Sequence, residues 1–187
     1  MLLGFSSGSG FALHVAASPL GKMLEQIVLL SPMLGIQAPT IKPEARAWAK
    51  AFNSRILALG LLNKFGIRIF NHLNVLAFAI DPLQADMLTG YYSYLLMIAF
   101  GTSDYAADLR NASSPVAVLV GERDELFHAG LFAPTIAAIR PDVPVTVVPG
   151  LSHIEMITDP RAVPAIIRPV RGQDRGQSGF RPASLAR

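Results

Sequence analysis

The 187-residue sequence contains no cysteine, which excludes disulfide bonds and thiol chemistry. Charged side chains are also scarce, at 16% of the residues, whereas hydrophobic side chains make up 51%. This composition is typical of a globular protein with a large core, and it excludes an intrinsically disordered chain. A chain of this length is expected to form one domain.

Long apolar runs are missing as well, although the mean hydropathy of +0.41 is high. A membrane-spanning helix needs about 18 or more consecutive apolar residues. The apolar runs of this chain, such as residues 75–80, stop far earlier at Asp, Gly or Pro. A basic segment followed by an apolar one, as in a secretory signal, is also absent. We therefore expect no transmembrane segment and a cytoplasmic location.

The net charge of +3 lies at the C-terminal end of the sequence. Residues 168–187 carry a net charge of +4 from five arginines and one aspartate, which leaves −1 for the remaining residues. No basic stripe with interleaved aromatic residues is present, so we expect no nucleic-acid partner. The Arg, Gly, Gln, Ser and Pro composition of residues 169–187 predicts a disordered basic tail.

Residues 4–8 read G-F-S-S-G and lie between a short apolar start and a helix-like run over residues 9–17. A sharp strand-to-helix turn of this kind exposes the serine hydroxyl, and flanking glycines are expected to let the turn close without Cβ clashes. Ser6 is therefore a candidate nucleophile. The N–H of Ser7, at the start of the following helix, would face an oxyanion formed at Ser6. A structural turn serine is the alternative interpretation of Ser6.

Two further polar residues follow apolar, β-branched runs that predict strands. Asp124 ends the motif G-E-R-D after residues 116–120, and His153 ends P-G-L-S-H after residues 145–148. A histidine titrates near neutral pH, which suits the transfer of the serine proton. The rivals for the acid are Glu122 and Glu125, and an ordinary loop histidine is the alternative for His153.

With these three motifs in this order, residues 1–168 resemble the α/β-hydrolases, and among them esterases, lipases and lysophospholipase-like proteins. The resemblance implies an α/β fold whose mainly parallel sheet of about four strands is the C-terminal part of the family fold. It also implies a catalytic triad of Ser6, His153 and Asp124, with the Ser7 N–H in the oxyanion hole. Asp124 is preferred because it matches the acid of the family motif G-E-x-D. The implied substrate is a small acyl ester, including lipid-like esters, cleaved without a cofactor. The other histidines lack metal-ligand spacing, so no metal site is expected.

Residues 35–112 interrupt the alternation of strands and helices. Their patterns predict helices over residues 43–59, 83–89, 91–100 and 102–110. The resemblance implies that this segment is a helical cap over the active site. After it, the sequence predicts a helix over residues 131–140 and a final helix from residue 159 that is broken by Pro164 and Pro169.

One departure from the family pattern concerns the start of the chain. The family places four strands and a helix before the nucleophile turn, whereas this sequence begins three residues before Gly4. We therefore expect an N-terminally truncated hydrolase with weak activity, because the loop that gives a second oxyanion donor is missing. The alternative is a non-catalytic remnant, or half of an enzyme that requires a partner. The oligomeric state stays open.

Overall fold

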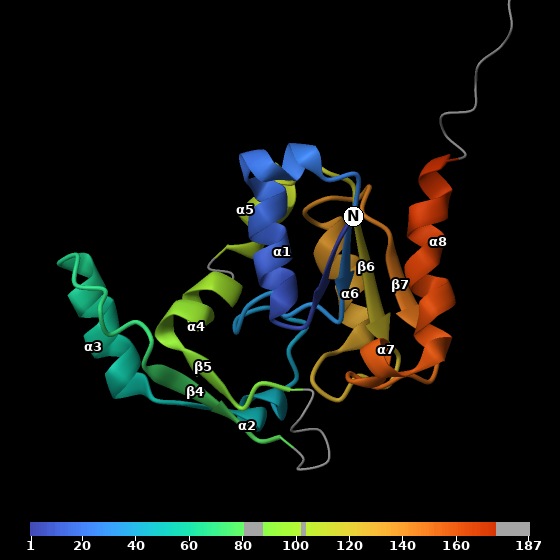
Figure 1. Ribbon diagram of the computed structural model, residues 1–187. Coiled ribbons are helices and arrows are strands. Elements are labelled where there is room, and N and C mark those ends of the chain that lie inside the picture. The colour runs from blue at the N-terminus through green and yellow to red at the C-terminus, as the bar shows by residue number, and fades with distance from the viewer. Residues whose placement is uncertain (81–87, 102–103, 175–187) are drawn as a thin grey trace, which may run out of the picture.

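A four-stranded parallel sheet forms the centre of the protein (Figure 1). The computed structural model describes residues 1–80, 88–101 and 104–174. The strand order is β1-β2-β6-β7, and each neighbouring pair is parallel. The strands are β1 (Leu2–Phe5), β2 (Ile27–Leu30), β6 (Val116–Gly121) and β7 (Val145–Val148). The predicted α/β fold with a parallel sheet of about four strands is confirmed.

The two central strands are buried on both faces. Every residue of β2 and β6 is buried, which explains why both read as continuous apolar runs without alternation. Strand β1 lies at one edge of the sheet, where Leu3 is 40% exposed. Among the described residues β1 pairs with β2 alone.

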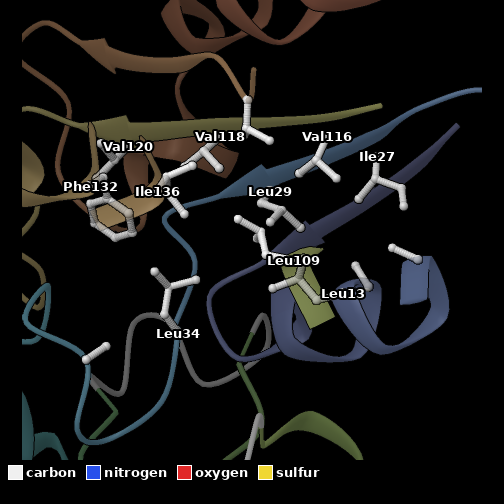
Figure 2. Packing of buried hydrophobic residues seen from close by; sticks show 14 of the residues in the cluster. Leu13, Ile27, Leu29, Leu34, Leu109, Val116, Val118, Val120, Phe132 and Ile136 are labelled. Atoms are coloured by element: carbon white, nitrogen blue, oxygen red, sulfur yellow. The ribbon is translucent and has the colours of Figure 1, made fainter. Parts of the chain in front are cut away.

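Helices cover the two faces of the sheet and make a three-layer arrangement (Figure 1). Ile27 and Leu29 of β2 point to one face, where they join a cluster with Leu13, Leu109 and other side chains from the covering helices (Figure 2). The helices on this face are α1 (Gly8–Ala17), α5 (Tyr105–Asn111) and α6 (Ala129–Ala137).

The alternate residues of β2, Val28 and Leu30, point to the opposite face. They pack there with Met156 and Ala162 of the C-terminal segment. That segment contains the short helix α7 (Glu155–Thr158), a 3-10 turn over Pro160–Ala162, and α8 (Val163–Asp174). Another 3-10 turn, Pro19–Met23, links α1 to β2. Strand β2 therefore contributes to the hydrophobic cores on both faces of the parallel sheet.

The segment between β2 and β6, called the insertion here (residues 35–112), differs from the prediction. It contains helices, as expected, and also a three-stranded antiparallel sheet in the order β3-β4-β5 that the sequence did not predict. Its elements before α5 are α2 (Ala45–Trp48), β3 (Ala49–Ala51), α3 (Asn53–Lys64), β4 (Asn74–Phe78), β5 (Tyr91–Ser93) and α4 (Tyr94–Phe100).

Tertiary pairing explains where these predictions failed. The single helix expected over residues 43–59 is split, because residues 49–51 pair with β4 despite their alanine-rich composition. The helix expected over residues 91–100 likewise begins with strand β5. The helix predicted for residues 83–89 lies largely outside the described residues.

The final helix also differs from the prediction. Helix α8 runs from Val163 to Asp174, so the expected breaks at Pro164 and Pro169 are wrong. The tail expected to begin at residue 169 is wrong for residues 169–174, which belong to α8. Pro164 lies in the first turn of α8, where the missing N–H has no helical partner to lose. Residues 175–187 lie outside the described part of the chain. None of the helices in the described ranges has the length and apolarity to cross a membrane.

Candidate active site

Ser6 lies at the sharp turn between β1 and α1. Its φ angle is 51°, a left-handed conformation that is rare for a residue with a side chain. Backbone hydrogen bonds hold the turn from both sides: the Ser6 N–H donates to Leu30 O over 2.9 Å, and Ser6 O accepts from the N–H groups of Ser9 and Met33, each over 3.1 Å. The neighbouring strand and the loop after it therefore stabilise the strained turn that aims Ser6.

The two glycines of the motif have different roles. A Cβ atom on Gly4 would lie 2.7 Å from Ser9 Cα and 2.9 Å from Ala12 Cβ, so Gly4 allows α1 to cross β1 closely. A Cβ atom on Gly8 would meet no described atom within 4 Å. The expectation that both glycines prevent clashes is therefore right for Gly4 and wrong for Gly8.

This difference predicts opposite effects of two alanine substitutions. We expect Gly4→Ala to lower the free energy of unfolding by about 2 kcal/mol or more, because backbone atoms must shift to accept the methyl group. Gly8→Ala is expected to leave stability unchanged or to raise it by up to about 1 kcal/mol, because it adds a helix-forming residue in open space. Urea unfolding of both variants measures the difference. Equal destabilisation by the two substitutions would contradict this assignment.

The structure brings the three predicted residues Ser6, Asp124 and His153 together. Ser6 Oγ lies 3.0 Å from His153 Nε2, and His153 Nδ1 lies 2.9 Å from Asp124 Oδ2. The side chains of both His153 and Asp124 are fully buried. Each residue follows the carboxyl end of a parallel strand, namely β1, β6 and β7, so the three ends place them at one edge of the sheet.

Other hydrogen bonds hold the Asp124 carboxylate in position. Its Oδ1 atom accepts the N–H groups of Leu126 and Phe127, over 3.0 and 2.9 Å, which leaves Oδ2 for the imidazole of His153. The ammonium of Lys42 donates to the backbone carbonyl of Asp124. No pattern in the sequence connects Lys42 with this loop. Its contact became visible only in the folded chain.

The two rivals for the acid, Glu122 and Glu125, support the histidine loop instead. Glu122 Oε2 accepts the Gly150 N–H over 2.8 Å, and Glu125 Oε2 accepts the backbone N–H of His153 over 2.9 Å. Glu155 accepts the Ser152 N–H over 2.7 Å, and this backbone hydrogen bond holds the pKa of Glu155 below its usual value. Three carboxylates therefore fix the loop that carries His153, while Asp124 bonds its ring.

The insertion contacts the site through two aromatic side chains that the sequence alone did not single out. Tyr92 OH lies 2.7 Å from Ser7 Oγ, across 85 residues of sequence. The Trp48 ring meets the His153 ring edge-on at 6.2 Å between centroids. Phe78 lies between them, at 5.5 Å from Trp48 and 4.7 Å from Tyr92. The abundance of aromatic residues in the insertion was the available signal, but it did not distinguish these positions.

We expect Tyr92→Phe to lower kcat for the reaction at Ser6 by up to about tenfold with little change in KM. The substitution removes the hydroxyl that holds Ser7, whose backbone N–H is the predicted oxyanion donor, and one hydrogen bond contributes about 1 kcal/mol. Steady-state kinetics separates kcat from KM. Tyr91→Phe is the matched control, because Tyr91 lies on the same strand and is 56% exposed. An unchanged kcat for Tyr92→Phe would contradict a positioning role.

The histidines other than His153 are not part of the site. His14 bonds Gly101 O and Asp108, and His72 bonds Ile69 O. Burial raises the pKa of the Asp108 carboxyl, although the adjacent His14 opposes the shift. Over residues 1–80, 88–101 and 104–174, no cluster of three or more His, Cys, Asp or Glu residues could hold a metal ion.

A parallel sheet with helices on both faces, and a serine, an acid and a histidine at the carboxyl ends of its strands, defines the class of the α/β-hydrolases. The family model described as "Serine aminopeptidase, S33" (Hydrolase_4) matches residues 1–161. The chain therefore belongs to this family of α/β-hydrolases. No curated protein sequence matches it.

Solved structures show the same fold at low sequence identity. A protein from Burkholderia cenocepacia described as an aryl esterase is 15% identical, with a TM-score of 0.61 over 94% of this chain and 65% of its own. The α/β-hydrolase GrgF from Penicillium sp. sh18 is 13% identical, with a TM-score of 0.59 over 93% of this chain and 62% of its own. A bromoperoxidase from Bacillus anthracis is 15% identical, with a TM-score of 0.54 over 91% of this chain and 66% of its own. The chain thus spans slightly less than two thirds of these relatives.

Proposed function

We propose that the chain hydrolyses carboxylic acyl esters through an acyl-enzyme formed on Ser6. The observation that carries this proposal is the continuous line of hydrogen bonds from Asp124 through His153 to Ser6 Oγ. In the same turn, no acceptor among the described residues is bonded to the Ser7 N–H, which supports its assignment to the oxyanion.

In the first half of the reaction, Ser6 Oγ attacks the ester carbonyl carbon while its proton passes to His153 Nε2. Asp124 accepts the Nδ1–H bond throughout, which selects the required tautomer and stabilises the imidazolium. The carbonyl oxygen becomes an oxyanion facing the Ser7 N–H. Collapse of this intermediate breaks the bond between the carbonyl carbon and the alkoxy oxygen of the ester. The alcohol departs with the proton from His153 Nε2, and the acyl group remains bound to Ser6.

The second half of the reaction repeats these roles with water. His153 removes a proton from a water molecule as its oxygen attacks the acyl carbon. The carboxylic acid departs when the bond to Ser6 Oγ breaks and His153 returns the proton to the serine. The chain's own residues supply every proton transfer, so the proposal requires no cofactor.

The surroundings of His153 support an uncharged, apolar ester as the substrate. Its ring lies among the rings of Phe5, Phe127 and Trp48, with centroid distances of 4.9, 5.2 and 6.2 Å. The nearby carboxylates, including Glu125, already accept backbone N–H groups of the acid and histidine loops. This arrangement favours an ester over a peptide whose α-ammonium group would need a carboxylate partner.

Hydrolysis of 4-nitrophenyl acetate and butyrate by the purified chain tests the proposal. We expect measurable turnover that Ser6→Ala reduces to the background rate. Ser9→Ala is the matched control from the same turn, because the buried Ser9 hydroxyl has no hydrogen-bond partner among the described residues. Equal rates for the unsubstituted chain and Ser6→Ala would overturn the proposed nucleophile. Faster hydrolysis of leucine 4-nitroanilide than of either ester would retain Ser6 but reject the ester class.

A further inference from the structure

Helix α3 carries leucines on two faces, but only one face has a packing partner in the described structure. Leu59 is 3% exposed and packs with Val75 and Tyr94 in a small core of the insertion. On the outer side, Leu57 and Leu61 are 76% and 56% exposed. A helix that is apolar all round is normally buried, so the outer face of α3 is unusual for a surface in water.

The chain that follows α3 extends this apolar surface. The helix ends at Lys64, and the loop that leads to β4 exposes several large side chains. We call residues 53–73 the apolar arm. In Figure 1, α3 lies apart from the four-stranded sheet, at the far end of the insertion. The exposed apolar side chains of the arm are Leu57, Leu61, Phe65, Ile67, Ile69, Phe70 and Leu73.

Charge within the arm has one sign. Residues 53–73 contain two arginines and one lysine and no aspartate or glutamate, a net charge of +3. Within the arm itself, Arg55, Lys64 and Arg68 are exposed. Apolar side chains bordered by cations, without any acid, are the features by which protein surfaces bind anionic lipid.

We propose that the apolar arm docks on the surface of an anionic lipid membrane, with its leucine, isoleucine and phenylalanine side chains inserted among the lipids and its cations at the headgroups. A second copy of the chain fits this surface less well, because pairing two arms would bring two acid-free basic surfaces together. Docking does not depend on the chemistry at Ser6, and the surface lies on a different part of the insertion from Trp48 and Tyr92.

Flotation with lipid vesicles tests the proposal on the full chain. We expect binding to vesicles of phosphatidylcholine and phosphatidylglycerol mixed three to one, and much weaker binding to phosphatidylcholine alone. Leu57→Ser with Leu61→Ser should lower the partition coefficient by on the order of tenfold for each side chain. Lys64→Glu with Arg68→Glu should lower it about fivefold for each unit of charge, and each of these substitutions changes the charge by two units. Salt should weaken the binding of the unsubstituted chain.

Two controls make the result specific. Leu20→Ser with Met23→Ser removes side chains that are 58% and 78% exposed on another part of the chain, and it should leave vesicle binding unchanged. Ser6→Ala should also bind normally, so that failure of the proposed esterase reaction and failure of membrane docking are separate outcomes. Equal binding by the arm variants and the unsubstituted chain would overturn the proposal. Dimer formation that is lost in the leucine variant, without vesicle binding, would overturn it in favour of a second copy.

Discussion

Replacing His153 by glutamine is expected to lower kcat for ester hydrolysis by about 10⁴-fold or more, because the side chain that accepts and returns the Ser6 proton is lost. Glutamine nearly fills the space of the imidazole, which matters because His153 is fully buried among aromatic rings. Ester kinetics combined with a thermal melting curve separates lost chemistry from lost folding.

The matched control for this prediction is His128→Gln. His128 is exposed at the start of α6, and its side chain makes no capping hydrogen bond there. We expect the control to retain the activity of the unsubstituted chain within a factor of about two, as for a surface substitution away from the site. A folded His153→Gln variant with nearly normal kcat would show that another group takes the proton.

The second large effect is expected from Asp124→Asn, which should lower kcat by about 10³ to 10⁴-fold. The asparagine amide can donate to His153 Nδ1, which favours the tautomer with the proton on Nε2, and that nitrogen then cannot accept the Ser6 proton. The comparison with Glu122→Gln and Glu125→Gln is the decisive part of the experiment. Both glutamates bond backbone N–H groups of the histidine loop and not the imidazole ring.

We expect Glu122→Gln and Glu125→Gln to reduce kcat by no more than about tenfold, because the amide oxygen can still accept the backbone hydrogen bond. All three variants are measured with the same ester near neutral pH. A loss for Glu125→Gln as large as that for Asp124→Asn would mean that the acid of the triad has been misassigned.

Sequence patterns predicted the structure best where it depends on residues that are close together in the sequence. The strand and helix around Ser6, and the turns after β6 and β7, depend on short apolar runs and their flanking turn residues. The three motifs in this order resemble those of the α/β-hydrolases, and that resemblance implied that Asp124 and His153 lie near Ser6, where the structure has them. The contact of Tyr92 with Ser7 could not be predicted, because it joins residues far apart and depends on how the insertion folds.

The insertion shows where hydrophobic periodicity fails to predict the secondary structure. Residues 49–51 continue a helical pattern, yet they form β3 because β4 offers a pairing edge. The motif around Ser6 shows a second limit: a glycine in a pattern does not by itself reveal crowding, since Gly4 is enclosed by α1 whereas Gly8 faces open space. Both features depend on which residues lie nearby in the folded protein, and a local sequence pattern does not contain that information.

The expectation of weak activity, and the alternative of a non-catalytic remnant or half-enzyme, stay predictions. Among the described residues, β1 pairs only with β2, and Leu3 is partly exposed at this edge. A loosely held β1 would loosen the turn that aims Ser6, and a displacement of about 1 Å can cost about 10²-fold in rate. The reactivity of Ser6 itself is therefore the quantity that separates these possibilities.

The most direct measurement is covalent labelling of the folded chain with a fluorophosphonate, followed by peptide mass spectrometry. An activated serine attacks phosphorus and expels fluoride, so the label reports the nucleophile without depending on the substrate. We predict a single adduct on Ser6 that is absent from Ser6→Ala and forms far more slowly in His153→Gln. A folded chain that remains unlabelled, or that carries the label on another residue, would contradict a serine hydrolase centred on Ser6.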